Sequence, residues 1–69
     1  MNLVKVAKLG TAVKEVALES TANVGDALRT AEVEAGGFEI RLNGNPVDST
    51  ATVRSGDIVT LVPQIKGGY

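Results

Sequence analysis

The side chains that most often carry out chemistry in proteins are missing from this sequence, which contains no cysteine and no histidine. Their absence excludes thiol nucleophiles, disulfide bonds and zinc or iron–sulfur sites built on these residues, and it removes the usual general base. Two pairs of carboxylates remain as candidates, Glu15 with Glu19 and Glu32 with Glu34. Because a chain this short is not expected to form a deep pocket, we interpret both pairs as solvated charges.

The sequence ends in QIKGGY, where Gly67 and Gly68 precede a single aromatic residue, Tyr69. Glycine is common at disordered termini, so this pair by itself favours a terminus without a role. Tyr69 is either an inert last residue or a removable cap on the glycines. Lys66 either contacts an acidic partner surface or is a solvated charge. The rest of the chain has to decide between these alternatives.

Composition predicts one small domain with an aliphatic core. The 69 residues are 43% hydrophobic and 22% charged, and only Phe38 and Tyr69 are aromatic. The net charge is −1 and no basic block is present, so the sequence disfavours nucleic-acid binding. No apolar run has the length of a membrane span, and no secretion signal is recognisable. We therefore expect a cytoplasmic protein that does not bind membranes.

Alternating apolar and polar residues predict a β-hairpin at the start of the chain. Residues 2–9 alternate with Val4 and Val6 on one face, and residues 13–19 alternate again. A short glycine-containing link at residues 10–12 joins the two runs, which is typical of a hairpin.

A helix is expected over residues 24–34, because the apolar residues there recur at helical spacing. Asn23 is its candidate N-cap, and Asp26 lies in the first turn, where the helix dipole favours negative charge. Gly36-Gly37 is the expected end of the helix, since glycine accepts the left-handed conformation found there. A glycine pair that ends a helix is not a phosphate-binding loop.

Three further strands are expected in the second half of the chain. Residues 38–42 alternate, and Asn43-Gly44 is the strongest short hairpin signal. Residues 45–47 form a short strand that Pro46 confines to an edge of the sheet. A turn at residues 55–57 leads to the most hydrophobic run, residues 58–63, which we expect at the centre of the sheet. The residues on the apolar phase of each element form the expected core: Val4, Val6, Val16, Leu18, Val24, Leu28, Ala31, Ile40, Val59 and Leu61.

This order of elements, with four segments in particular, resembles the ThiS and MoaD family of sulfur carriers within the ubiquitin-like superfamily. The segments are NVGDAL at the helix start, LNGNPVD at the hairpin, TVRSGDIVTLVP before and within the last strand, and IKGG at the end. The resemblance implies an α+β β-grasp fold, a mixed sheet of four to five strands with one helix packed on one face. It divides the chain into a domain at residues 1–64 and a flexible C-terminal segment at residues 65–69.

The resemblance also implies a mechanism that needs no catalytic side chain and no bound cofactor. In that family an E1-like enzyme uses ATP to adenylate the terminal glycine carboxylate. The acyl-adenylate then receives sulfur as a thiocarboxylate or passes to a thiol and a lysine. Further partners are a sulfurtransferase or a synthase subunit. Gly67 and Gly68 fit this role because they are slim and flexible enough to enter a narrow channel.

Tyr69 departs from the family pattern, in which most members end at the second glycine. The carboxyl carbon of Gly68 is here joined to Tyr69 by a peptide bond. Some ubiquitin-like carriers carry extra residues that a protease removes, often a zinc metalloprotease, so this chain is either a precursor or not activated at all. The alternative function is a ubiquitin-like binding module whose glycines are incidental, and an engineered scaffold is a minor third reading.

The sheet face turned away from the helix is the expected partner surface. The register places Thr60 and Val62 on it beside Arg41, and Ile65 and Lys66 extend it toward the glycines. It is more polar than the hydrophobic patch of ubiquitin, so we favour a partner that recognises the C-terminal segment. We expect the isolated protein to be a monomer.

Overall fold

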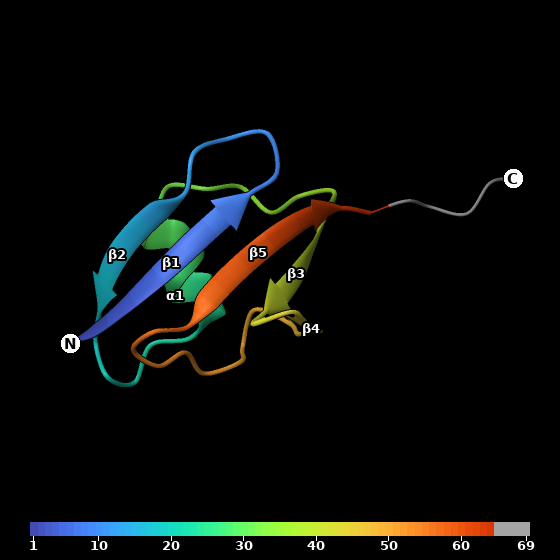
Figure 1. Ribbon diagram of the computed structural model, residues 1–69. Coiled ribbons are helices and arrows are strands. Elements are labelled where there is room, and N and C mark those ends of the chain that lie inside the picture. Colours follow the sequence, from blue (N-terminus) through green and yellow to red (C-terminus); the bar gives the residue numbers. More distant parts are fainter. Residues whose placement is uncertain (65–69) are drawn as a thin grey trace, which may run out of the picture.

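The computed structural model describes residues 1–64 as one sheet of five strands with a single helix on one face (Figure 1). The elements follow the chain in the expected order, β-β-α-β-β-β. Their bounds are β1 Asn2–Lys8, β2 Lys14–Leu18, α1 Val24–Thr30, β3 Phe38–Leu42, β4 Asn45–Pro46 and β5 Ile58–Pro63. The first two strands are each slightly shorter than predicted, and β3 and β5 have the predicted bounds.

The strands lie side by side in the order β2-β1-β5-β3-β4. The pair β1–β5 is parallel, with Lys5 beside Ile58, and every other pair is antiparallel. The sheet is therefore mixed, as the resemblance implied. β5 occupies the centre and β4 an edge, and both placements were predicted.

The turn between β3 and β4 confirms the hairpin predicted at Asn43-Gly44. Asn43 has φ of 51° and Gly44 has φ of 88°, the left-handed values that a tight hairpin turn requires. The Asn43 side chain also accepts a hydrogen bond from Ile58 N–H (3.0 Å) and donates one to Asp57 (3.0 Å). One residue thus closes the hairpin and fixes the start of the central strand.

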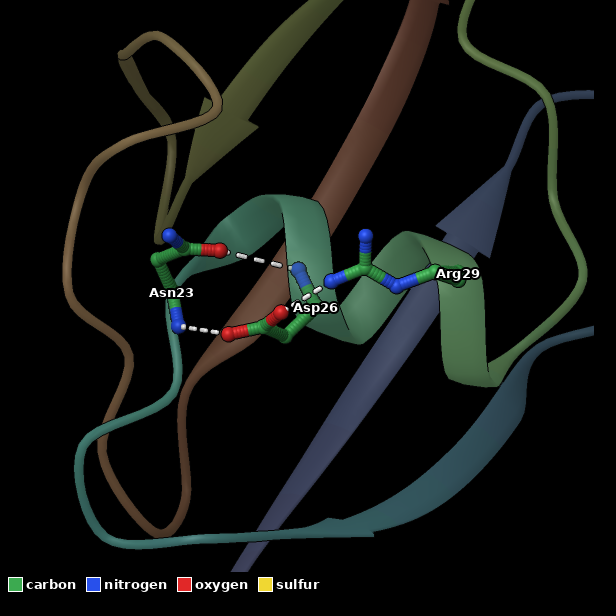
Figure 2. A network of polar contacts seen from close by, with 3 residues as sticks. All are labelled: Asn23, Asp26 and Arg29. Atoms are coloured by element: carbon green, nitrogen blue, oxygen red, sulfur yellow. Dashed lines mark hydrogen bonds and ion pairs between the residues drawn. The ribbon is translucent and has the colours of Figure 1, made fainter.

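Asn23 caps α1 as the sequence predicted, and Figure 2 shows the contacts around it. Its side chain accepts a hydrogen bond from Asp26 N–H (2.9 Å), and its own N–H donates to the Asp26 carboxylate (3.1 Å). The other oxygen of that carboxylate pairs with Arg29. These reciprocal bonds form a capping box, which satisfies backbone donors that a helix start leaves without partners.

A loop of the second half of the chain completes the helix start. Val24 N–H donates to Ala51 O and Gly25 N–H donates to Ser49 O, both at 2.9 Å. A Cβ atom on Gly25 would lie 3.4 Å from Ser49 O and 3.3 Å from Asn23 Oδ1. Glycine at this position therefore permits the close approach of the loop to the helix.

The helix ends at Thr30, whereas the sequence analysis placed its end at Glu34, before Gly36-Gly37. Glu32 adopts φ of 58°, and Val33 N–H donates to Leu28 O (3.0 Å) while Glu32 N–H donates to Arg29 O (3.1 Å). This is the Schellman arrangement, here with glutamate in the left-handed position that glycine usually occupies. It turns the chain so that Val33 packs against the core, and that burial is the gain that ends the helix early.

The core lies between α1 and one face of the sheet, and it contains every predicted core residue except Ile40. Ile40 is only half-buried, because it lies on β3 next to the two-residue edge strand β4 and packs against the rim of the core. Three buried residues were not predicted: Ala22, Ala27 and Val53. Val53 lies outside the named strands and the helix, between the polar residues Thr52 and Arg54, yet it is fully buried and its N–H donates to Ala22 O (3.2 Å).

Replacing Leu61 with alanine should destabilise the protein by roughly 2–5 kcal/mol, because Leu61 is fully buried and the substitution leaves a cavity. Ile58→Ala on the same strand is the matched control, since Ile58 is 42% exposed, and it should cost less than about 1 kcal/mol. Urea denaturation of the two variants measures both values. Equal midpoints would contradict this assignment of the strand faces.

Asp48 gives a prediction about pH. The Thr50 hydroxyl donates a hydrogen bond to the Asp48 carboxylate, and so does the Thr50 N–H (2.9 Å). Both bonds lower the pKa of Asp48 below its usual value, and the bond from the hydroxyl has the larger effect. A lowered pKa in the folded state stabilises the protein above the unfolded-state pKa, and this contribution disappears as the pH falls through the folded-state pKa. Thr50→Val should raise the Asp48 pKa in a carboxyl NMR titration, whereas Thr21→Val should not change it.

Candidate functional site

The outer face of the sheet, defined as the face turned away from α1, carries the described residues of the predicted partner surface. Thr60 lies opposite Arg41 and Val62 opposite Glu39 in the β3–β5 register. Val59 and Leu61 alternate with them and are fully buried on the other face. Arg41, Thr60 and Val62 therefore lie together on one half-buried surface, as the alternation predicted.

Arg41 is held in place on this face by its neighbour Glu39. Its Nε donates to the Glu39 carboxylate at 2.6 Å, and the two side chains are 43% and 36% exposed. An ion pair this exposed contributes little to stability. Its effect is to direct the Arg41 side chain along β3 toward Glu39.

The outer face also carries two apolar residues that the sequence analysis did not include in the partner surface. Leu3 on β1 is 51% exposed and Ile58 on β5 is 42% exposed. Both line a shallow hollow of about 320 Å³, together with Lys5 and Glu15. The signal that could have identified them is the same alternation, since Leu3 shares a face with Lys5, and Ile58 shares one with Thr60.

The end of β5 is fastened to the start of β3, and the described chain ends there. Gln64 N–H donates to Gly37 O (3.1 Å), and Pro63 lies opposite Phe38 in the register. We call this point the root of the C-terminal segment. The predictions for the C-terminal segment, including its expected mobility, concern residues outside the described part of the chain: Ile65, Lys66, Gly67, Gly68 and Tyr69.

Lys8 contacts Phe38 at the start of β3, next to this root. Its Nζ lies 4.6 Å from the centroid of the Phe38 ring and donates to Glu34 O (3.0 Å). A cation over an aromatic face is attracted by the ring electrons, and here it also satisfies a loop carbonyl. Lys8 thus connects β3, the strand to which the root is fastened, with Glu34 in the segment between α1 and β3.

Within residues 1–64, no group of three or more acidic side chains comes close enough together to hold a metal ion. The carboxylates named as candidates lie apart, with Glu15 and Glu19 on and just after β2, and Glu32 and Glu34 after α1. All four are exposed. In this part of the chain there is also no helix long and apolar enough to cross a membrane.

Solved structures identify the fold. SAMP1 of Haloferax volcanii superimposes with a TM-score of 0.79 at 19% identity, covering 97% of this chain and 100% of its own. The ubiquitin of Caldiarchaeum subterraneum gives a TM-score of 0.65 at 19% identity, covering 97% of this chain and 98% of its own. The domain is a ubiquitin-like β-grasp fold, as expected.

The chain belongs to the ThiS family, whose sequence profile matches residues 5–68. The thiamine biosynthesis protein ThiS of Geobacter metallireducens is 25% identical, with a TM-score of 0.63, over 93% of this chain and 99% of its own. A chain of the complex of subunits 1 and 2 of the molybdopterin-converting factor of Helicobacter pylori is 26% identical, with a TM-score of 0.67, over 96% and 99%. No curated protein matches the sequence.

The two faces of β5 can be distinguished by one substitution on each. Thr60→Glu should leave the free energy of unfolding within about 1 kcal/mol of the original, because Thr60 lies on the outer face opposite Arg41. Leu61→Glu should prevent folding, because it places an unpaired charge in the core. Thermal melts followed by circular dichroism test both. A folded Leu61→Glu protein would show that the register is wrong.

Proposed function

We propose that this protein is a sulfur carrier or a ubiquitin-like modifier that is activated at the carboxylate of Gly68. The observation that carries the proposal is the extent of the ThiS family match, which includes Gly67 and Gly68 and leaves Tyr69 outside. The chain has no histidine or cysteine with which to catalyse a reaction of its own. It is the substrate of an activating enzyme, and ATP is consumed by that enzyme.

The chemistry takes place on the backbone carboxylate. A carboxylate oxygen attacks the α-phosphate of ATP, pyrophosphate leaves, and an acyl-adenylate forms. The terminal sulfur of a persulfide on a sulfurtransferase then displaces AMP and forms an acyl disulfide. A thiol attacks the sulfurtransferase sulfur of that disulfide, which releases the thiocarboxylate and leaves a new disulfide between the thiol and the sulfurtransferase. A thiol of the activating enzyme displaces AMP in the same way when the product is a conjugate on a lysine.

The geometry of the described residues supports delivery of this carboxylate to a partner's active site. The hydrogen bond from Gln64 to Gly37 fixes where the C-terminal segment leaves the domain. From Gln64 to Gly68 an extended chain spans roughly 17 Å at about 3.3 Å per residue. Two residues without side chains at its end pass through a channel that is too narrow for larger ones.

The partners follow from this chemistry. An E1-like enzyme adenylates the protein, and a synthase subunit consumes the sulfur. The Helicobacter pylori relative was solved as a complex of two subunits of a molybdopterin-converting factor, which supports a partner of the second kind. The outer face, with Arg41, Thr60 and Val62, is the surface that we assign to docking. Ile65 and Lys66 are the further residues that we assign to contacts with the same partner.

Tyr69 makes the 69-residue chain a precursor in this proposal. The carboxyl carbon of Gly68 is part of a peptide bond and cannot be adenylated until the residue after it is removed. A metalloprotease is the class of enzyme that we propose for this step. Its product is the form that ends at Gly68.

A second candidate, a non-catalytic binding module, is favoured by one observation. Leu3 and Ile58 expose apolar surface on the outer face, which a protein partner could cover without involving the glycines. The two functions differ in what they require of Gly68. Only the carrier or modifier needs its free carboxylate.

The protein that ends at Gly68 should be adenylated and receive sulfur, whereas the 69-residue form should not react. A tyrosine ring is far wider than glycine and blocks entry into the channel. Both forms are incubated with an E1-like enzyme shown to bind the domain, ATP and a sulfur donor, and the products are weighed by mass spectrometry. A mass increase of the shorter form alone is the expected result.

Gly68→Ala in the shorter form is the matched control. It should slow the reaction and leave the amide spectrum of residues 1–64 unchanged, since it lies beyond β5. Equal reaction of the two lengths would refute the role of Tyr69 as a cap. Failure of both lengths to react would favour the binding module instead.

A further inference from the structure

The sheet has two edges, and they differ in how well they are protected. β4 consists of Asn45–Pro46 only, and proline has no N–H to offer to another strand. β2 spans Lys14–Leu18, contains no proline and pairs with β1 without a bulge. Figure 1 shows β2 as the outermost strand on its side of the sheet. An unprotected edge of this length is a template for an added strand.

Hydrogen bonds on the other side of β1 show which β1 residues face β2. Lys5 N–H donates to Asp57 O (3.0 Å) and Leu9 N–H donates to Leu61 O (3.1 Å), so the odd-numbered residues of β1 aim their backbone groups at β5. Successive residues of a strand aim these groups in opposite directions. The even-numbered residues of β1 therefore face β2.

The same alternation identifies the free backbone groups of β2. Val4 lies opposite Val16, and Val16 therefore directs its N–H and C=O back toward β1. Glu15 and Ala17 direct theirs away from the sheet. Within residues 1–64 no backbone hydrogen bond reaches either of them. Two residues spaced about 6.8 Å apart thus offer two donors and two acceptors to an incoming strand.

The charges along this edge determine what kind of strand fits. Glu15 and Glu19 are exposed, and the two ion pairs formed by residues 1–64 involve neither of them. The one basic residue of β2, Lys14, turns its Nζ to Ala31 O at the helix end (2.8 Å). Lys5 lies opposite Glu15 on β1, but no ion pair joins the two side chains within residues 1–64. In this part of the chain the edge therefore presents two carboxylates without an ion-pair partner.

A groove beside the edge also carries a carboxylate, that of Glu19. It has a volume of about 350 Å³ and lies between the end of β2 and α1, where Leu18 and Ala22 provide apolar wall, Thr30 a hydroxyl and Glu19 a carboxylate. It can hold side chains of a strand laid along β2. A second copy of this protein would bring the same two glutamates to the same ribbon, so like charges disfavour it.

We propose that the free edge of β2 binds an extended, lysine- or arginine-rich segment of a partner protein as an added antiparallel strand. The backbone of the partner pairs with Glu15 and Ala17, and its basic side chains meet Glu15 and Glu19. This interaction does not rest on the activation of Gly68, because the edge is a different part of the sheet from the root of the C-terminal segment. It gives the domain a second binding surface that does not require Gly68.

The probe is a short blocked peptide of alternating lysine and valine, titrated into the isotope-labelled 69-residue protein and followed by NMR. We expect shifts centred on the Glu15 and Ala17 amides and slower hydrogen exchange at both. The matching peptide with glutamate in place of lysine should not bind. A lysine peptide that is N-methylated at alternate residues keeps its charge but cannot form the ladder, and it should bind at least about tenfold more weakly.

Protein variants separate the two contributions. Ala17→Pro removes one outward N–H and should abolish binding, while Ala17→Ser keeps the N–H and should bind normally. Glu15→Gln combined with Glu19→Gln should weaken binding roughly fivefold, as two exposed ion pairs allow. Glu32→Gln combined with Glu34→Gln changes the net charge equally and should have little effect.

Several results would overturn the proposal. They are shifts centred on Ile58 and Thr60 of the outer face, equal binding of the glutamate peptide, undiminished binding of the methylated peptide, and no shifts at any peptide concentration. Edge shifts that depend on protein concentration alone would identify a second copy of the chain as the occupant and would also refute it. If Ala17→Pro does not fold, the N-methylated peptide still tests whether binding needs backbone hydrogen bonds, because it is used with the unchanged protein.

Discussion

The structure depends on the parallel pairing of β1 with β5, which joins the first strand of the chain to the last. Val6 lies beside Val59 in that pair, and both are buried beneath α1. Each of these two strands has the other on one side and a strand of five residues on its far side, so the pair forms the middle of the sheet. The core, the outer face and the root of the C-terminal segment all take their positions from this central pair.

Local patterns in the sequence were sufficient to predict most of this arrangement. Alternation located β3 and β5 within their observed bounds, and the capping residues located the start of the helix. The end of the helix was missed because a glycine pair is a stronger local signal than Glu32. The observed stop depends on Val33 reaching the core, which is a tertiary contact that no local pattern contains. The burial of Val53 escaped prediction for the same reason, since its neighbours in the sequence are polar and its hydrogen-bond partner is Ala22.

The residues of the candidate site also divide into those that a local pattern predicts and those that depend on contacts between distant strands. The alternation of β3 and β5 placed Arg41, Thr60 and Val62 on one surface, because strand periodicity determines facing once the register is known. Ile58 follows the same alternation as Thr60 and could have been included, whereas placing Leu3 beside it requires the pairing of β1 with β5, which spans most of the chain. The local sequence pattern could not predict that β2 has a free edge either. Whether a strand lies at an edge depends on the order of all the strands in the sheet.

The pairing of β1 with β5 also determines when the protein can fold during its synthesis. The ribosome releases β1, β2 and α1 first, but the strand that closes the core is the last one to emerge. Until then β1 has an open side where β5 will lie, and the apolar faces of Val4 and Val6 have no complete cover. Pairing between such distant strands is a slow step in folding. A chain interrupted anywhere before Ile58 therefore lacks its core altogether, and it exposes β1 as an additional strand edge for aggregation.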